Sequence, residues 1–229
     1  MDQARVERDA HSVHREIWLR KENIWPMGLP PLEAMLSPHI AARVLDLEYD
    51  IRQELGGDGS RQWGAKAGGF FDRGRGIIAI SASCSYEVQR YTGAHEIGHA
   101  VMHPWIGDKV VHRDLPIGAA SFATRTPHER EADYFAACFL MPRKLVEKEF
   151  ALRFGTKKPL PRDETVAFHL RVADTRGFFS ASADSLVFAS LLAHAQSFDR
   201  RRFSSLACHF GVSVKAMAIR LRELGLIDE

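Results

Sequence analysis

The spacing of hydrophobic residues predicts a helix over residues 86–103. Its apolar side chains recur every three or four positions, which gives a helix one face to bury. They are Val88, Tyr91, Ala94, Ile97 and Val101. Ser85 suits the N-cap, Glu87 places negative charge in the first turn, and Pro104 cannot continue the helix. Gly98 costs stability in mid-helix, so we expect a neighbouring group to pass close to the backbone there.

A second helix is predicted over residues 127–140, where the same spacing recurs. Its apolar positions are Ala132, Phe135, Ala136, Phe139 and Leu140. Thr126 is a good N-cap residue, Pro127 suits the first helical position, and Pro142 follows the end of the helix.

A short extended block precedes the first of these helices. Phe70, Phe71 and most of residues 77–80 are aromatic or β-branched, and they flank a turn-forming cluster at residues 72–76. We therefore expect a β-hairpin that leads almost directly into the helix. The second strand of the hairpin fits two roles equally well. It is either an interior strand or a sheet edge on which an extended peptide can pair by main-chain hydrogen bonds.

The first sixty residues carry weaker patterns. Residues 5–21 mix a few apolar side chains with many charges and predict a helix that docks weakly. Residues 37–55 predict a second helical region, although residues 47–51 fit a strand as well. Residues 56–60 have the composition of a loop.

Composition narrows the class of protein. A chain of 229 residues with 45% hydrophobic content can form one sizeable domain, or a domain plus a small appendage. The net charge of +2 demands neither nucleic acid nor an anionic membrane as a partner. The cysteines lack paired spacing, so we expect buried thiols rather than a disulfide framework or thiolate zinc site. They are Cys84, Cys138 and Cys208. With no signal-peptide pattern and no membrane-spanning apolar run, the protein is expected in the cytoplasm.

The first helix carries the pattern His95-Glu96-Ile97-Gly98-His99. Residues four apart lie on the same face of a helix, so His95 and His99 can present two ring nitrogens to one ion while they point away from the apolar face. Glu96 lies about 100° round the helix, close enough to take a proton from metal-bound water. Two nitrogen ligands with an adjacent carboxylate predict a hydrolytic zinc site.

A catalytic zinc site usually has a third protein ligand, and the second helix offers three acidic candidates. Glu129 falls on the same side as the apolar positions, whereas Glu131 lies about 200° round the helix. Asp133 lies one turn beyond Glu129 and can accept the second ring N–H of a ligand histidine. We favour Glu129 as the ligand. The alternative use of its carboxylate is a capping box with Thr126.

Two stretches, RYTGAHEIGHAVMH at residues 90–103 and EREADYFAACFLMP at residues 129–142, resemble the ImmA/IrrE family of zinc metallopeptidases. The hairpin GGFFDRGRGIIAIS at residues 68–81 is also similar. The resemblance implies an α+β fold, a small gluzincin-like domain with a short sheet and an active-site helix. It implies that His95, His99 and Glu129 bind Zn²⁺, that Glu96 is the catalytic base, and that Asp133 is the acidic position after the ligand.

The resemblance also implies a class of substrate, and the chain as a whole is expected to divide into three segments. We expect an N-terminal helical segment at 1–60, a zinc metallopeptidase domain at 61–155 and a helical C-terminal region at 156–229. The implied function is a zinc-dependent endopeptidase that cleaves a helix-turn-helix transcriptional repressor, in a stress response or mobile-element induction. The alternative is a DNA-binding regulator with a structural or degenerate metal site. Several side chains can supply the oxyanion donor: His103, His112, His128, Arg125 and Tyr134.

The C-terminal region predicts one helix over residues 182–198 and, over residues 204–224, two helices around a tight turn at Gly211. The layout of this pair resembles the helix-turn-helix motif of DNA-binding proteins. In the last helix we expect a buried apolar stripe and three outward basic residues. The stripe is Val214, Met217, Leu221 and Leu224, and the basic residues are Lys215, Arg220 and Arg222. So few basic side chains favour buttressing or docking of a protein substrate over sequence-specific DNA binding.

Overall fold

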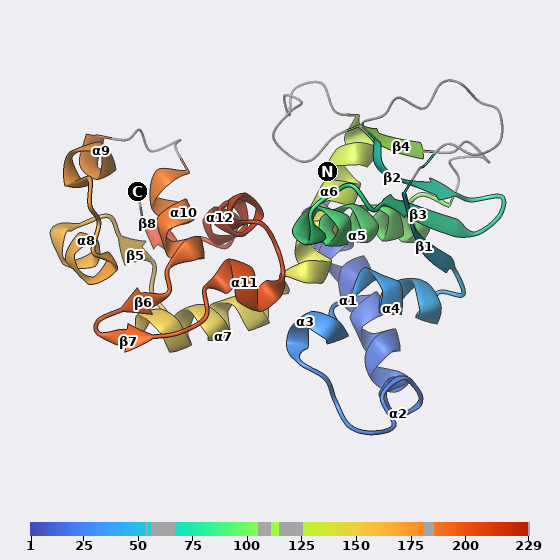
Figure 1. Cartoon of the computed structure of the whole chain (residues 1–229), viewed down its shortest axis with the longest axis horizontal. Helices are drawn as coiled ribbons and strands as arrows, with labels where there is room; N and C mark the ends of the chain where they lie inside the picture. Colours follow the sequence, from blue (N-terminus) through green and yellow to red (C-terminus); the bar gives the residue numbers. More distant parts are fainter. Residues whose placement is uncertain (54, 56–66, 105–110, 115–125, 181–185, 229) are drawn as a thin grey trace. The chain divides into compact units, whose positions relative to one another are not determined.

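The computed structural model describes residues 1–53, 55, 67–104, 111–114, 126–180 and 186–228. The chain divides into two compact units, Met1–Leu140 and Met141–Glu229, which are described separately. The fold is α+β, with helices and small sheets (Figure 1). The expected loop at residues 56–60 lies outside the described residues, and the three-segment division of the chain stays a prediction.

In its described residues, the N-terminal unit combines several helices with a small sheet. In order, its elements are α1 (Gln3–Leu19), α2 (Lys21–Ile24), α3 (Leu32–Met35), α4 (Pro38–Val44), β1 (Glu48–Arg52), β2 (Ala67–Asp72), β3 (Ile77–Ser81), α5 (Tyr86–Met102), β4 (Val111–Asp114) and α6 (Pro127–Leu140). Helices α5 and α6 confirm the two predicted helices in the middle of the chain.

The sheet has the strand order β1-β3-β2-β4. Strands β2 and β3 form the predicted antiparallel hairpin, with Phe70 opposite Ala79. Strand β3 also pairs in parallel with β1, so it is an interior strand and not the edge. The open question at residues 47–51 resolves as a strand, because Glu48–Arg52 pairs along β3. Only Pro38–Val44 of the expected helical region 37–55 is helical.

Helix α5 is enclosed on nearly every side, and this corrects the expectation of one apolar face with outward histidines. It packs against β2 and β3 on one side and against α4 and α6 on others (Figure 1). Both His95 and His99 are buried, whereas Val88 is only half-buried. Ser85 occupies the N-cap position, but its side chain makes no capping hydrogen bond.

Gly98 lets α6 approach α5 closely, as predicted. A Cβ at this position would stand 3.1–3.2 Å from three atoms of Phe135 on α6. Phe135 is itself fully buried, so it has little room to move.

Helix α1 docks firmly, so the expectation of weak docking is wrong. Its buried stripe is Val6, Ala10, Val13 and Ile17, while Trp18 and Leu19 are exposed. Three polar contacts join α1 to α6. Arg5 pairs with Glu131 at 3.0 Å, the Tyr134 hydroxyl donates to Glu7 at 2.8 Å, and a ring nitrogen of His14 lies 2.9 Å from the Phe139 carbonyl oxygen.

The C-terminal unit is mostly helical around a core rich in phenylalanine. Its elements are α7 (Arg143–Phe154), β5 (Leu160–Pro161), α8 (Glu164–Leu170), α9 (Thr175–Ser180), α10 (Val187–His194), β6 (Ser197–Phe198), β7 (Arg201–Arg202), α11 (Leu206–Phe210), α12 (Val214–Glu223) and β8 (Ile227–Asp228). Two helices flank the turn at Gly211, whose φ of 61° suits a residue without Cβ. The likeness of this pair to a DNA-binding motif stays a prediction.

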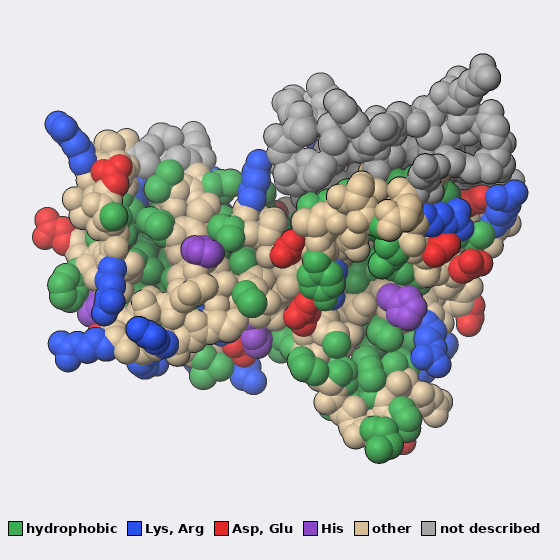
Figure 2. All heavy atoms as spheres, in the orientation of Figure 1, with side chains coloured by type: hydrophobic (Ala, Val, Ile, Leu, Met, Phe, Trp, Pro, Cys, Tyr) green, Lys and Arg blue, Asp and Glu red, His purple; other side chains and the backbone are tan. Residues whose placement is uncertain are grey.

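Two expectations for the last helix need correction. Arg220 is 1% exposed, and its Nε donates to the Met141 carbonyl at 3.1 Å, so it does not point outward. Val214 is only half-buried, although Met217, Leu221 and Leu224 are buried as predicted. Several of the basic side chains visible in Figure 2 lie in the region of α7, β6 and β7, where Arg201 and Arg202 are exposed.

The three cysteines are free, which agrees with the absence of a disulfide framework. Cys138 is buried, Cys84 is half-buried and Cys208 is exposed, so only one of them fits the expected buried thiol. Among the described residues, no helix combines the length and apolar character needed to cross a membrane.

Candidate metal centre

Helix α5 brings two imidazole rings together one turn apart. The Nε2 atoms of His95 and His99 lie 3.0 Å from each other, and the ring planes meet at 73°. The rings are buried, with 0% and 2% of their side chains exposed. The sequence pattern alone predicted this pairing, because helix periodicity is a local property of the chain.

Helix α6 supplies a carboxylate to the same point. Glu129 places Oε2 at 3.1 Å from His95 Nε2 and Oε1 at 3.3 Å from His99 Nε2. The start of α6 aims this side chain, because the Thr126 hydroxyl oxygen accepts the Glu129 backbone N–H at 3.3 Å. Thr126 therefore caps the helix while the Glu129 carboxylate contacts the two rings, so the carboxylate is not used in a capping box.

Asp133 lies behind His95, one helical turn beyond Glu129. Its Oδ1 atom is 3.0 Å from His95 Nδ1. A carboxylate can only accept a hydrogen bond, so Nδ1 carries the ring proton and Nε2 of a neutral His95 keeps its lone pair. The lone pair faces Glu129 and His99. This is the orienting contact predicted for Asp133.

Behind His99 lies a contact that the sequence analysis did not find. The Nδ1 atoms of His99 and His103 are 3.0 Å apart, and His103 Nε2 lies 3.0 Å from Glu131 Oε2. Arg5 Nη2 reaches the same Glu131 oxygen at 3.0 Å. The available signal was the four-residue step from His99 to His103, which continues the ligand face by one turn.

The protonation states suit cation binding. Burial lowers the pKa of His99 to about 4, and burial also lowers the pKa of His103 despite its hydrogen bond to Glu131. Burial alone would raise the pKa of Glu129, but the two imidazoles beside it hold that pKa well below its usual range. Neutral imidazoles and an ionised carboxylate are the forms in which these groups bind metals.

The geometry of the three groups fits a zinc ion. Their candidate ligand atoms all lie within 4.8 Å of one another. Ligands of a tetrahedral zinc with bonds of roughly 2.0–2.1 Å stand about 3.3 Å apart, and the separations here are 3.0, 3.1 and 3.3 Å. Lone pairs that converge in a buried space repel one another unless a cation lies between them.

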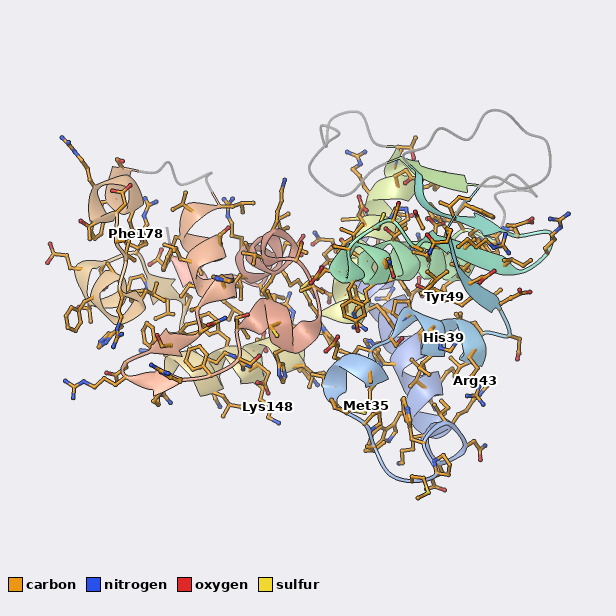
Figure 3. All side chains as sticks on the ribbon, viewed as in Figure 1. Met35, His39, Arg43, Tyr49, Lys148 and Phe178 are labelled. Carbon is orange, nitrogen blue, oxygen red and sulfur yellow. The ribbon has the colours of Figure 1, made fainter. Side chains whose placement is uncertain are left out.

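Glu96 is fully buried next to His95. Burial raises the pKa of the Tyr49 hydroxyl on β1, the charge of Arg90 opposes this shift, and the charge of Glu96 adds to it. Figure 3 labels Tyr49 beside His39 of α4, and the two rings meet edge to face with centroids 5.8 Å apart. No local sequence pattern pointed to Tyr49, which lies far from α5 along the chain.

The structure describes the side chains of only some of the candidates for an oxyanion donor. The Tyr134 hydroxyl donates to Glu7, and His103 contacts Glu131. The His128 ring lies edge to face with His103, with centroids 4.9 Å apart. Arg125 and the side chain of His112 lie outside the described part of the chain. The identity of the donor therefore stays a prediction.

One comparison with known proteins gives a match. The family model described as Peptidase M78, IrrE N-terminal-like domain, covers residues 60–172. This range contains His95, Glu96, His99, Glu129 and Asp133 but begins after α1 and β1. No curated protein matches the chain at a significant level.

Proposed function

Because the chain belongs, through residues 60–172, to the ImmA/IrrE family of peptidases, we propose that it is a zinc-dependent endopeptidase. In this proposal His95, His99 and Glu129 are the zinc ligands and Glu96 is the general base. One observation carries it: two imidazole Nε2 atoms and a carboxylate converge within 3.3 Å of one another.

A bound zinc would supply a Lewis acid that polarises the scissile carbonyl and makes water more acidic. Glu96 accepts the proton of the attacking water and returns it to the leaving amine. Its burial favours this role, because a desolvated carboxylate is a stronger base than a hydrated one. Asp133 keeps the His95 ring turned with its lone pair toward the ligand position.

For the substrate we propose an intracellular helix-turn-helix transcriptional repressor, as the family resemblance implies. The protein then acts in transcription regulation through proteolysis. The burial of Arg220 weakens the alternative of a DNA-binding regulator, because it removes one of the three basic side chains expected to face a phosphate backbone.

Metal content and cleavage test the proposal together. The purified protein should hold about one equivalent of zinc. His95→Ala and His99→Ala should lose it, whereas Glu96→Gln should keep it and cleave about 10²- to 10⁴-fold more slowly. Cleavage is measured on the repressor encoded nearest to this gene, before and after a chelator and after zinc is returned.

Glu87→Gln, in the first turn of the same helix, is the matched control and should behave as wild type. Loss of zinc from Glu96→Gln would contradict the assignment of roles. Cleavage that survives complete removal of metal would contradict the proposed activity.

A further inference from the structure

The two histidines of the metal centre are held in different ways. His95 contacts Asp133 directly, at 3.0 Å. His99 contacts a second buried imidazole, His103, which is 0% exposed and whose far nitrogen meets Glu131. The series of hydrogen bonds therefore runs from His103 to the Glu131 carboxylate. It ends at Arg5 of helix α1, which donates to the same carboxylate.

The direction of each hydrogen bond, from His99 to Arg5, can be worked out from the two charged groups, Glu131 and Arg5. Arg5 can only donate and an ionised Glu131 can only accept, so His103 Nε2 carries the proton that it gives to Glu131. In a neutral His103 the Nδ1 atom is then an acceptor, and His99 Nδ1 must donate to it. His99 keeps its lone pair on Nε2, the nitrogen that faces His95 and Glu129.

The backbone under these rings is fixed from the opposite side. Arg73, in the turn of the β2–β3 hairpin, donates from Nη2 to the carbonyl oxygens of His99 and His103, at 3.0 Å each. The last turn of α5 therefore cannot shift easily to compensate for a change in the side-chain series. A change at Glu131 should reach the His99 ring itself.

From these contacts we infer that Arg5, Glu131 and His103, here called the α1 relay, position His99 for metal binding and make helix α1 part of the metal centre. This inference rests on the proposed metal site. Arg5 lies in α1, Glu131 in α6 and His103 at the C-cap of α5, and Arg5 lies outside the segment that matches the family model. They are positioning residues that act through His99.

The contributions of the three residues should differ. His103 and Glu131 are 0% and 15% exposed, and partners that orient a metal ligand typically change metal affinity by about 10- to 100-fold. Arg5 is 37% exposed, so solvent screens its charge and its loss should cost only a few-fold. Helix phase alone assigned Glu131 no role in metal binding.

Affinity for zinc alone, measured by competition with a chelator, tests the inference. Glu131→Ala should weaken zinc binding about 10- to 100-fold, and Arg5→Ala a few-fold, with rescue by Arg5→Lys. Glu131→Gln should fall between wild type and Glu131→Ala, because an amide oxygen still accepts from His103 but lacks the charge. Arg8→Ala, at an exposed site on the same helix, is the matched control and should bind zinc as wild type does.

A second comparison separates positioning from general stability. In a His99→Ala background, Glu131→Ala should weaken binding of Co²⁺ no further, because its effect passes through His99, whereas Asp133→Ala should still weaken it through His95. The visible absorption of bound Co²⁺ should change in Glu131→Ala and not in Arg8→Ala. If Glu131→Ala does not fold, Arg5→Ala and Glu131→Gln carry the same test.

Zinc affinity in Glu131→Ala and Arg5→Ala equal to that of wild type would overturn the relay and leave the metal site standing. A further loss of Co²⁺ affinity from Glu131→Ala in the His99→Ala background would also overturn it. Failure of the wild-type protein to bind zinc would instead remove the proposed function on which the relay depends.

Discussion

At Gly93, helix α5 comes close to the Tyr49 side chain of β1. A Cβ at this position would clash with the Tyr49 hydroxyl and stand 3.0 Å from Cβ of Pro38. Glu96 lies one turn further along the same helix, on a neighbouring face. The missing side chain at Gly93 therefore lets Tyr49 reach the surroundings of the proposed base.

Gly93→Ala should lower the free energy of unfolding by about 1–3 kcal/mol, the usual cost of overpacking. The loss should appear even though alanine is favoured over glycine in a helix by roughly 1 kcal/mol. Tyr49→Phe should recover part of the loss in the Gly93→Ala background, because it removes the clashing oxygen. Urea unfolding of the four proteins in this cycle measures the effect.

Gly74→Ala is the matched control, since its nearest neighbour, Asp72 Oδ1, would be 3.6 Å away. It should stay within about 0.5 kcal/mol of wild type. Equal stability of the two alanine variants would show that Tyr49 does not approach α5 as described.

Local spacing accounts for what could be predicted about single residues. His95 and His99, and likewise Glu129 and Asp133, lie one helical turn apart, so each pair follows from periodicity once a helix is assigned. Arg5 and Glu131 are 126 positions apart, so no local sequence pattern could predict their contact. For the same reason the sequence offered no sign of Tyr49.

The packing of α1 on α6 should make the stability of the fold depend on pH, because it buries the His14 ring. The His14 ring lies over Phe139, with centroids 5.0 Å apart, and donates from Nε2 to the Phe139 carbonyl at 2.9 Å. Burial is the largest influence on this ring and lowers its pKa from 6.5 to about 4, although the hydrogen bond opposes it. Between about pH 6.5 and pH 4, His14 is therefore protonated in the unfolded chain but neutral in the folded chain.

As the pH falls from 7 to 4.5, wild type should lose about 2–3 kcal/mol of stability relative to His14→Gln. The sign follows because a lowered histidine pKa stabilises the fold only above the unfolded value, near pH 6.5. Urea unfolding of both proteins at the two pH values measures the change. Parallel pH profiles for the two would show that His14 is not the group responsible.

Which elements could be predicted depended on whether their cause is local. The sequences of α5 and α6 have N-cap residue types and periodic apolar positions, and the β2–β3 hairpin has its turn cluster, so local sequence predicts all three. Strand β1 exists because Glu48–Arg52 pairs with β3, a partner that the local sequence does not show. The docking of α1 was underestimated because two of its most apolar side chains, Trp18 and Leu19, are exposed while the small Ala10 is buried.

On the scale of the whole molecule, the segment that matches the family and the compact units have different limits. The match covers residues 60–172, whereas the N-terminal unit runs from Met1 to Leu140. The match therefore omits α1, α4 and β1, which cover α5 and α6 or extend the sheet, and it ends inside the C-terminal unit.

A chain cut to residues 60–172 should fail to unfold cooperatively and should bind zinc far more weakly than the full chain, although it keeps every proposed ligand. The reason is that it exposes the buried faces of α5, α6 and β3. Thermal unfolding and chelator competition measure both properties. Residues 1–140 are the matched comparison and should keep a cooperative transition. Zinc affinity in the short chain equal to that of the full chain would show that the N-terminal elements are dispensable.

The contact between α1 and α6 also sets an order of events during synthesis. The His14 and Phe139 positions are 125 residues apart, so the ribosome releases the buried stripe of α1 long before its partner exists. At roughly 5–20 residues per second, that interval lasts about 6–25 s. During it, the apolar side of the first helix lacks its cover from α6, although α4 is already available to pack against it. The proposed catalytic centre can therefore assemble only after Glu129 has been translated.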